Sequence, residues 1–424
     1  MLLRRFRRWP LKARRFCLEA ARLADGAQTP LYLVGGCVRD LLLGAGSGDV
    51  DLVVEGDGVA FALRCARAFG GRCVTHRRFG TATLEADDGF RVDIASSRKE
   101  TYDFPGALPR VERGTIRDDL LRRDFTVNAL AMSLNRGSFG RLLDFCGGAA
   151  DLRAKIIRVL HAGSFFDDPT RIVRAVRFEE RLRFRRERRT RQWMQDAVAA
   201  RALFDVQKHR LRDELLLLFR EPDPYGCLRR LHRAAGLAFI SPRLRWDAAW
   251  GRRFRDAAAA IRWFQECRAH RRPEPDVVYM ALFLAGLPLR EIERVVRAFA
   301  LPGKAAQSIL GLRRHAGRVR RVLARARVAP SAVHGLLAPL SPEAILGILA
   351  GQTDARVRRR IRDFLSCYSG QRSHVTGEDL KAFGLRPGPA YKRILEGVLR
   401  ARLDGRVHTR EEELVWARRL IQKS

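Results

Sequence analysis

Short apolar runs alternate with helical patterns over the first 150 residues, a texture typical of an α/β domain. Residues 31–34 (LYLV) form an apolar run that ends at a glycine pair, which predicts a strand meeting a turn. Residues 49–54 (DVDLVV) alternate acidic and apolar positions, as a strand with two different faces does. The pattern also predicts strands over 81–85 and 90–95 and helices over 38–43 and 57–69.

From about residue 151 the strand signals disappear, and apolar residues recur every three or four positions. This helical pattern is clear over 168–178, 191–200 and 209–220. Segment 99–119 is polar and contains prolines and glycines, so it is predicted to be a flexible loop rather than a strand. We predict an α/β head domain, a helical neck, a helical body and a helical tail over residues 1–150, 151–225, 226–350 and 351–424.

The charge balance points to a polyanionic partner. Lys and Arg number 82 against 47 Asp and Glu, a net charge of +35. A genome that favours Arg over Lys could exchange the two, but it would not create this surplus. Each basic run on a helix could be an ordinary solvated face, but their repetition over the helical part favours an extended phosphate-binding surface. Residues 1–16 are basic and lack a secretory apolar core, so they are predicted to be a basic arm or the start of a helix.

Cysteine use and hydropathy narrow the class of protein further. The eight cysteines form no C-x-x-C pair, so no zinc-ribbon spacing is present, and reduced thiols are expected. No apolar run reaches the roughly 18 residues of a membrane span. These features predict a cytoplasmic protein that does not act at a membrane.

Three acids are candidate metal ligands. Asp49 and Asp51 are one residue apart on a predicted strand, so both side chains lie on one face. Asp93 lies on a later predicted strand, and it could instead belong to a salt bridge. Carboxylates side by side repel unless a cation lies between them, and Mg²⁺ prefers such oxygen ligands. The acids therefore predict a site for two Mg²⁺ ions, which can clamp both oxygens of a phosphoryl displacement.

A glycine pair lies just upstream of these acids. Gly35 and Gly36 follow a predicted strand and precede a predicted helix, so backbone N–H groups can approach a phosphate closely there. Arg39 can add a charge-assisted hydrogen bond to the same phosphate.

Four motifs occur together in this sequence: GGCVRDLLLG with GDVDLVV, LLRRDFTVNALA at 120–131, and DDPTRIVRAVRF at 167–178. In this order the chain resembles the class II tRNA nucleotidyltransferases and bacterial poly(A) polymerases of the DNA polymerase beta superfamily. The motifs cover about residues 30–220.

The resemblance implies roles for individual residues. Asp49 and Asp51 match the catalytic metal ligands, and Asp93 matches a position where some relatives lack Asp. Gly35, Gly36 and Arg39 match the turn that contacts the triphosphate. The family's ribose-recognition stretch corresponds to Arg122, Arg123, Asp124 and Asn128, and its base-reading pair to Asp168 and Arg171. His209-Arg210 stands where many relatives have Glu-Arg, so a role carried by that Glu does not transfer.

The base-reading pair also makes chemical sense. Asp168 and Arg171 are three residues apart, so a helix would place them on one face. An acceptor-only Asp and a donor-only Arg can pair with cytosine or adenine, whereas uracil and guanine present a carbonyl to the Asp. Arg174 and Arg177 continue the three-residue spacing and are predicted to face the triphosphate.

The predicted function is template-independent addition of C and/or A residues to tRNA 3′ ends, using CTP and ATP and releasing pyrophosphate. An A-adding enzyme and a poly(A) polymerase of the same family are the alternatives, because they share all four motifs. A protein that kept the fold as a non-catalytic RNA-binding module is a further alternative. Asp49, Asp51 and Arg39 argue against it, because a lost activity would free such residues to change.

Overall fold

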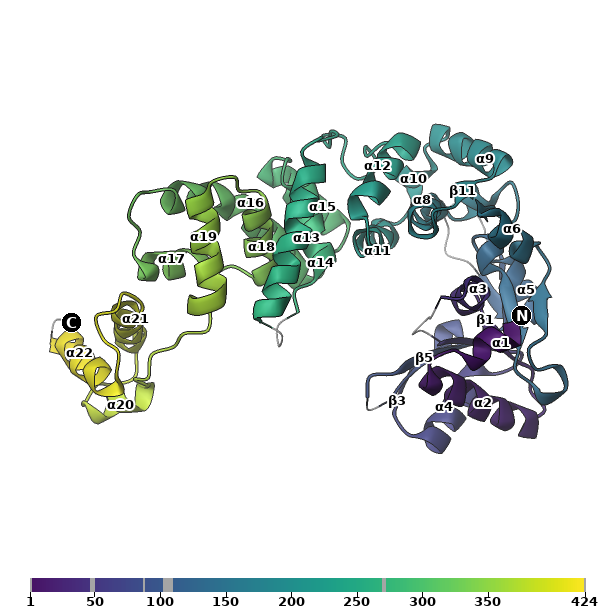
Figure 1. Cartoon of the computed structure of the whole chain (residues 1–424), viewed down its shortest axis with the longest axis horizontal. Coiled ribbons are helices and arrows are strands. Elements are labelled where there is room, and N and C mark those ends of the chain that lie inside the picture. The colour runs from purple at the N-terminus through teal and green to yellow at the C-terminus, as the bar shows by residue number, and fades with distance from the viewer. Residues whose placement is uncertain (1, 46–49, 87, 102–109, 269–271, 423–424) are drawn as a thin grey trace. The chain divides into compact units, whose positions relative to one another are not determined.

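The computed structural model describes residues 2–45, 50–86, 88–101, 110–268 and 272–422, apart from the side chain at position 78. It divides into two compact units (Figure 1), residues 1–214 with 230–236 and residues 215–229 with 237–424. The helices that begin in the first unit are α1 (Leu2–Arg7), α2 (Leu11–Gly26), α3 (Gly36–Leu43), α4 (Gly58–Phe69), α5 (Ile116–Leu121), α6 (Gly148–Ala154), α7 (Ser164–Asp167), α8 (Thr170–Leu182), α9 (Arg188–Ala199), α10 (Ala202–Asp205) and α11 (Lys208–Phe219).

A seven-stranded sheet forms the centre of the first unit, in the order β3-β4-β5-β2-β1-β8-β9. Its strands are β1 (Leu31–Val34), β2 (Val50–Val54), β3 (Arg72–His76), β4 (Thr81–Glu85), β5 (Arg91–Ser96), β8 (Leu130–Ser133) and β9 (Leu142–Asp144). β2 and β5 are parallel, and the other neighbouring pairs are antiparallel. The four predicted strands are confirmed, whereas β3, β8 and β9 were not predicted. All four residues of β8 are buried, so it lacks the alternation that marks a strand with one exposed face.

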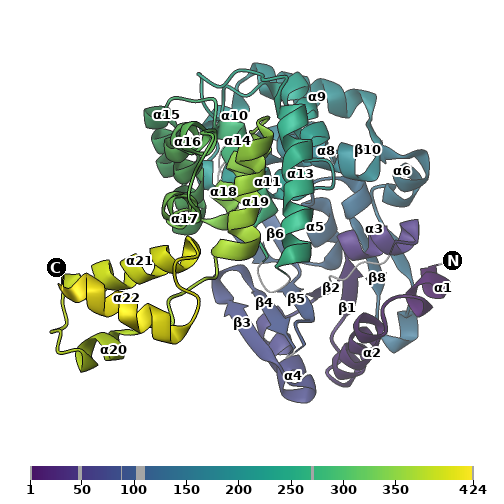
Figure 2. The same cartoon turned by 60° about the vertical axis from the view of Figure 1, so that its left-hand side comes forward.

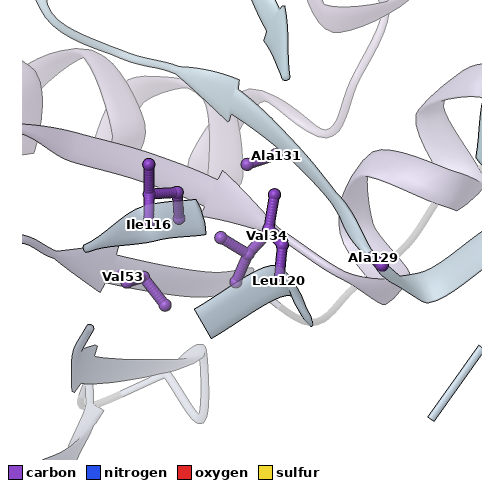
Figure 3. Packing of buried hydrophobic residues seen from close by; sticks show 6 residues of the cluster. All are labelled: Val34, Val53, Ile116, Leu120, Ala129 and Ala131. Atoms are coloured by element: carbon purple, nitrogen blue, oxygen red, sulfur yellow. The ribbon is translucent and has the colours of Figure 1, made fainter. Parts of the chain in front are cut away.

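One face of the sheet is partly covered by α5. Val34 and Val53 of the sheet pack against Ile116 and Leu120 of this helix (Figure 3). Successive side chains of a strand point to opposite faces, so Asp51 lies on the same face as Val53.

The segment between β5 and α5 is more ordered than its composition predicted. Arg98–Thr101 (β6) and Arg110–Arg113 (β7) pair as antiparallel strands, while residues 102–109 lie outside the described residues. The prediction of a loop over 99–119 is therefore wrong at both ends. Each strand is four residues long and polar, and its stability comes from the partner strand, which local composition does not reveal. A further short parallel pair joins β10 (Ile156–Ile157) and β11 (Arg185–Arg186), where no strand was predicted.

The N-terminal basic segment was predicted to be either a basic arm or the start of a helix. The structure shows that it is helical. The side chains of Leu2, Phe6 and Trp9 are buried, and Phe6 makes an edge contact with Phe139 at 5.5 Å between ring centroids. α1 packs against α3.

The second unit is helical throughout its described residues. It contains α13 (Trp250–Cys267), α14 (Pro275–Leu284), α15 (Leu289–Ala298), α16 (Gly303–Leu323), α17 (Pro330–Leu337), α18 (Pro342–Ala350), α19 (Ala355–Asp363), α20 (Gly377–Ala382), α21 (Pro389–Leu403) and α22 (Arg410–Gln422), and α12 (Pro224–Ala235) crosses the boundary between the units. α13, α14, α16 and α18 pack together (Figure 2), and α20–α22 enclose a separate small core around Leu380 and Val398. Among the described residues no single helix is long and apolar enough to cross a membrane, although α17 and α18, bent by 111°, meet such a criterion as a pair.

Candidate active site

A cavity of about 670 Å³ opens within the first unit, beside the Asp51 end of β2. Ten predicted site residues line it: Gly36, Arg39, Asp51, Arg122, Arg123, Asp124, Asn128, Asp168, Arg171 and Arg174. They come from α3, β2, the α5–β8 connection, the α7–α8 connection and α8, so segments more than 100 residues apart meet at one wall. Gly35, Asp93 and Arg177 do not line the cavity, and Asp49 lies outside the described residues.

The glycine turn brings the backbone close to a guanidinium. Gly35 has φ +66° and ψ −127°, a conformation that residues with a Cβ rarely adopt. A Cβ at this position would also collide with the guanidinium of Arg123. Gly35 therefore allows β1 to turn directly into α3 while Arg123 stays against the turn.

Arg39 is held rigidly at the first turns of α3. Its side chain is buried, and it donates to Asp40 Oδ1 at 2.8 Å and to Asn128 Oδ1 at 2.7 Å. Its guanidinium carbon lies 5.3 Å from the ring centroid of Phe178 on α8. Contacts in three directions leave the guanidinium little freedom, so its position is set before any ligand arrives.

Two of the three predicted acidic ligands are neighbours in the sheet. Asp51 of β2 and Asp93 of β5 are register partners in parallel strands, so their side chains share one face. Thr83 donates to the Asp93 carboxylate at 2.5 Å between Oγ1 and Oδ1, and half of the Asp93 side chain is exposed. Within the described residues no group of three or more Asp, Glu, His or Cys side chains is placed to hold a metal ion. The oxygen donors of Asp51 and Asp93 nevertheless suit a hard divalent cation.

A buried carboxylate at the end of α5 holds the two arginines of the RRDF motif. Asp119 is fully buried, and it accepts from Arg122 Nη2 at 2.5 Å and from Arg123 Nη2 at 2.9 Å. Burial alone would raise the pKa of Asp119, but the guanidinium groups of Arg123 and Arg122 outweigh it and hold this pKa below its ordinary value. Arg122 also donates to Glu100 of β6 at 3.0 Å, which ties the β6–β7 hairpin to the cavity.

A chain of charge-assisted hydrogen bonds crosses the cavity floor. Asn128 donates to Asp124 at 3.0 Å, and Arg174 of α8 donates to the other Asp124 oxygen at 2.7 Å. Glu214 of α11 accepts from Arg174 and from Arg177, each at 2.9 Å. Burial would raise the pKa of Asp124, but Arg174 and Asn128 outweigh it and lower this pKa. Arg177 thus holds Glu214, and its predicted approach to a triphosphate has no support in this geometry.

The helix argument that brought Asp168 and Arg171 together is wrong, although both line the cavity. α8 begins at Thr170, and Asp168 has an extended backbone with φ −138° and ψ 92°. Its carboxylate accepts from the backbone N–H and the hydroxyl of Thr170, at 3.1 and 2.6 Å, so it caps the helix from outside. The guanidinium paired with Asp168 is that of Arg210, at 2.9 Å.

Arg171 is buried and held from two sides. It donates to the hydroxyl of Ser164 at 2.6 Å and to the backbone carbonyl of Arg122 at 2.9 Å. A guanidinium has five N–H donors, so others remain for a ligand.

Sequence reasoning missed several residues of this site, chiefly Arg210, Glu214, Asp119 and Phe178. Glu214 falls four residues after Arg210 on α11, a spacing that places both on one helix face, and this signal could have marked them. The position of Phe178 beneath Arg39 and Arg174 depends on the fold, and no local pattern marks it.

Comparisons with known proteins agree with this geometry. The model of the poly(A) polymerase head domain matches residues 31–158. The A-adding tRNA nucleotidyltransferase of Geobacter sulfurreducens is 39% identical over 96% of this chain, which spans 47%, about half, of that relative's length. The A-adding tRNA nucleotidyltransferase of Halalkalibacterium halodurans is 32% identical over 94% of this chain and 91% of its own length.

The solved structures agree as well. The Thermotoga maritima CCA-adding enzyme complexed with tRNA superposes with a TM-score of 0.68 at 31% identity, covering 98% of this chain and 96% of that one. The predicted α/β head with a helical remainder is confirmed by this match. The chain therefore belongs to the family that its four motifs predicted, the tRNA nucleotidyltransferases.

Proposed function

We propose that this protein adds nucleotides to the 3′ end of tRNA without a nucleic-acid template. The 3′ oxygen of the RNA bonds to the α-phosphorus of the incoming nucleotide, while the bond to pyrophosphate breaks. The observation that carries the proposal is the convergence of ten residues from four motifs on one cavity of about 670 Å³. A cavity of this size is in the range of small-molecule sites, and its arginines complement a triphosphate.

The terminal A is the proposed addition. Two A-adding enzymes are similar to this chain over 94–96% of its length, which favours ATP as the nucleotide. Complete CCA addition, with CTP as a second substrate, is the other candidate. It is favoured by the likeness to the Thermotoga enzyme, which covers 98% of this chain.

We assign the contacts of the nucleotide as follows. The Gly35-Gly36 turn and Arg39 hold the triphosphate, because backbone N–H groups at the start of α3 and a fixed guanidinium face the cavity there. Asp124 and Asn128 lie at the cavity floor, where a ribose hydroxyl can donate to the carboxylate. Asp168 and Arg171 read the base edge, Asp168 as acceptor and Arg171 as donor.

The oxygen donors of Asp51 and Asp93 suit divalent cations, and we propose two Mg²⁺ ions, with Asp49 of the same sequence motif as a further ligand. When bound, such ions supply positive charge beside the reacting phosphate and lower the pKa of the attacking hydroxyl. The chain's own part is to fix these donors on two parallel strands and to hold the arginines in place. The helical neck, body and tail are proposed to grip the tRNA through its phosphates, and the cytoplasm, where tRNA is processed, is the proposed location.

Extension of defined RNA ends tests the proposal. Three tRNAs, one lacking CCA, one ending in C and one ending in CC, would be incubated with CTP, ATP or both, beside an unstructured RNA. Addition of one A to the CC end alone identifies an A-adding enzyme, and addition of C, C and A to the shortest end identifies a CCA-adding enzyme. Long A tails on the unstructured RNA would instead identify a poly(A) polymerase, and no extension of any RNA would refute the proposal.

Asp51→Asn is the matched inactive variant. Replacing a charged oxygen ligand by an amide should lower kcat at least ~100-fold, because the charge that holds the cation is lost. tRNA binding, measured by fluorescence anisotropy, should stay within about twofold, since the helical phosphate contacts are untouched. Extension at the wild-type rate would remove Asp51 from the mechanism.

A further inference from the structure

The N-terminal helices carry a group of cations that the active site does not use. Arg4, Arg7 and Arg8, at the end of α1, and Lys12 and Arg15, on the first turns of α2, are exposed. We call these five residues the N-terminal basic surface. The first acidic residue in the chain is Glu19.

The two helices are held so that these cations lie together. Arg14 of α2 donates to the backbone carbonyl of Arg7, which joins the end of α1 to the start of α2. Lys12 and Arg15 form ion pairs with Asp88 and Glu19.

Arg4, Arg7 and Arg8 are different from the other two cations. Within the described part of the chain, no carboxylate forms an ion pair with any of them. Like charges gathered without counter-charges repel, so a bound polyanion would relieve this repulsion.

The surface is fixed to the wall of the active site. Arg5 of α1 donates to the carbonyl of Leu41, at the last turn of α3, at 3.3 Å. α3 begins at Gly36, which lines the cavity, and a helix of its eight residues is about 12 Å long. The basic surface is therefore joined to the last turn of a short helix whose earlier residues, among them Gly36 and Asp40, form part of the cavity wall. The phosphates of a nucleic-acid strand are about 3.4 Å apart along the axis, so this span corresponds to a few nucleotides.

Most of the apolar side chains of these helices are buried, and the large ones that stay exposed are Leu3, Leu11 and Leu18. Leu2, Phe6, Trp9, Ala13, Phe16 and Cys17 are all buried in the first unit. A helix that lies in a membrane surface must offer its apolar face to lipid, and here that face packs against protein. The exposed side offers guanidinium groups, which suit phosphate oxygens through paired hydrogen bonds.

We propose that the N-terminal basic surface is a second RNA-binding site, which holds backbone phosphates of the substrate RNA a few nucleotides from its 3′ end. The proposal rests on the proposed function, because an enzyme that extends RNA must hold the strand that leads into its cavity. It adds to that function a contact on the head that is separate from the helical domains.

The test compares two variants of the full-length protein with equal loss of charge on the first unit. One carries Arg4→Gln, Arg7→Gln and Arg8→Gln. The control carries Arg64→Gln, Arg67→Gln and Arg72→Gln, at exposed positions of α4 and β3. Binding of a tRNA ending in CC is measured by fluorescence anisotropy from 50 to 200 mM salt, without nucleotide, and circular dichroism checks that both variants fold.

Three lost phosphate contacts should reduce the slope of log affinity against log salt by about 2 to 3. Over that salt range the wild type should therefore lose about 20- to 40-fold more affinity than the N-terminal variant, while the control keeps the wild-type slope. The kcat for extension at saturating tRNA should stay unchanged, because these residues do not touch the cavity. Equal slopes in all three proteins, or equal changes in the variant and the control, would overturn the proposal.

Two further readouts separate the alternatives. If the wild type sediments with phosphatidylglycerol vesicles and the N-terminal variant does not, while their tRNA slopes agree, the surface serves a membrane and the proposal is wrong. Binding is measured without catalysis, so a wild type that binds tRNA with the expected slopes but extends no RNA would refute the proposed function and leave this site standing.

Discussion

Asp168 makes contacts that nothing in its local sequence indicates. One carboxylate oxygen caps α8 through Thr170, and the other pairs with Arg210 from α11. The DDPTR motif pointed to the residue, but the predicted helix began two residues too early and included it. Pro169 supplies no N–H group and suits the first turn of a helix, so the chain stays extended at Asp168 and the carboxylate is free to turn back onto the helix end.

At this scale we predict that Asp168→Asn weakens the choice of base. An amide can donate to the carbonyl of guanine or uracil, which a carboxylate cannot do, while its oxygen still caps Thr170. The preference in kcat/KM for ATP over GTP should fall about 5- to 150-fold, the equivalent of 1–3 kcal/mol for one mismatched polar contact. Asp213→Asn, at another acid that lines the cavity, is the control and should leave the preference unchanged. An unaltered ratio in Asp168→Asn would mean that the base is read elsewhere.

At the scale of elements, local sequence patterns predict a strand where it forms an apolar run or where its two faces differ in polarity. β1, β2, β4 and β5 were predicted because an apolar run or an alternating pattern marks them. β6 and β7 were not predicted because each is stabilised by pairing with the other strand, from which it is separated in the sequence by residues 102–109. Ten of the residues that line the cavity were predicted from the motifs, but their contacts were not, since pairs such as Arg174 with Glu214 join helices 40 residues apart.

The turn between β1 and α3 gives a prediction about geometry. Gly35→Ala should destabilise the first unit by about 1–2 kcal/mol, because Ala must adopt a left-handed backbone. Its Cβ should also displace the Arg123 guanidinium, so the KM for ATP should rise as well.

Gly44→Ala is the matched control for that change. Gly44 ends α3 with φ +77°, and the nearest atom to a new Cβ belongs to Arg5, at 3.8 Å. Thermal unfolding should show a similar loss of stability in both variants, whereas steady-state kinetics should show a raised KM only in Gly35→Ala. A raised KM in both would contradict a specific role for the Arg123 contact.

The links between α8, α11 and the α5–β8 connection should depend on acid pH. The pKa of Asp124 is lowered in the folded protein, so its ionised form stabilises the fold at every pH above its ordinary value. This stabilisation is lost as the pH falls below about 4 and through the lowered folded-state pKa. Denaturant unfolding should show a steeper acid loss for the wild type than for Asp124→Asn, so that the difference in stability between the two shrinks as the pH falls below about 4. A constant difference down to pH 3 would show that the charge of Asp124 is not what stabilises these links.

At the scale of the whole molecule, the chain divides into two compact units, and this division determines which part of the chain holds the active site. All residues that line the cavity belong to the first unit, residues 1–214 with 230–236. Composition indicates a polyanion as partner, because net charge does not depend on the fold, but the extent of each unit depends on packing between distant segments.

This division predicts how a nucleotide changes thermal unfolding. Scanning calorimetry should show two transitions, and ATP with Mg²⁺ should raise only the one that belongs to the first unit. At 100 times its Kd a ligand adds about 2.7 kcal/mol to the unit that binds it. Hydrogen exchange would identify the protected unit, and equal protection of the second unit would contradict a site confined to the first.

The ion pairs of the cavity have a consequence for protein engineering. Asp119, Asp124, Asp168 and Glu214 each already engage an arginine that lines the cavity. A single substitution at any of them strands a charge in a confined space, and its measured cost will include that stranded charge. Libraries that replace these acids one at a time by apolar residues will therefore combine any change of specificity with a loss of stability, whereas an amide of the same shape, as in Asp168→Asn, keeps the hydrogen-bonding geometry. Useful variants should be found by exchanging acid and arginine together, two positions in one step.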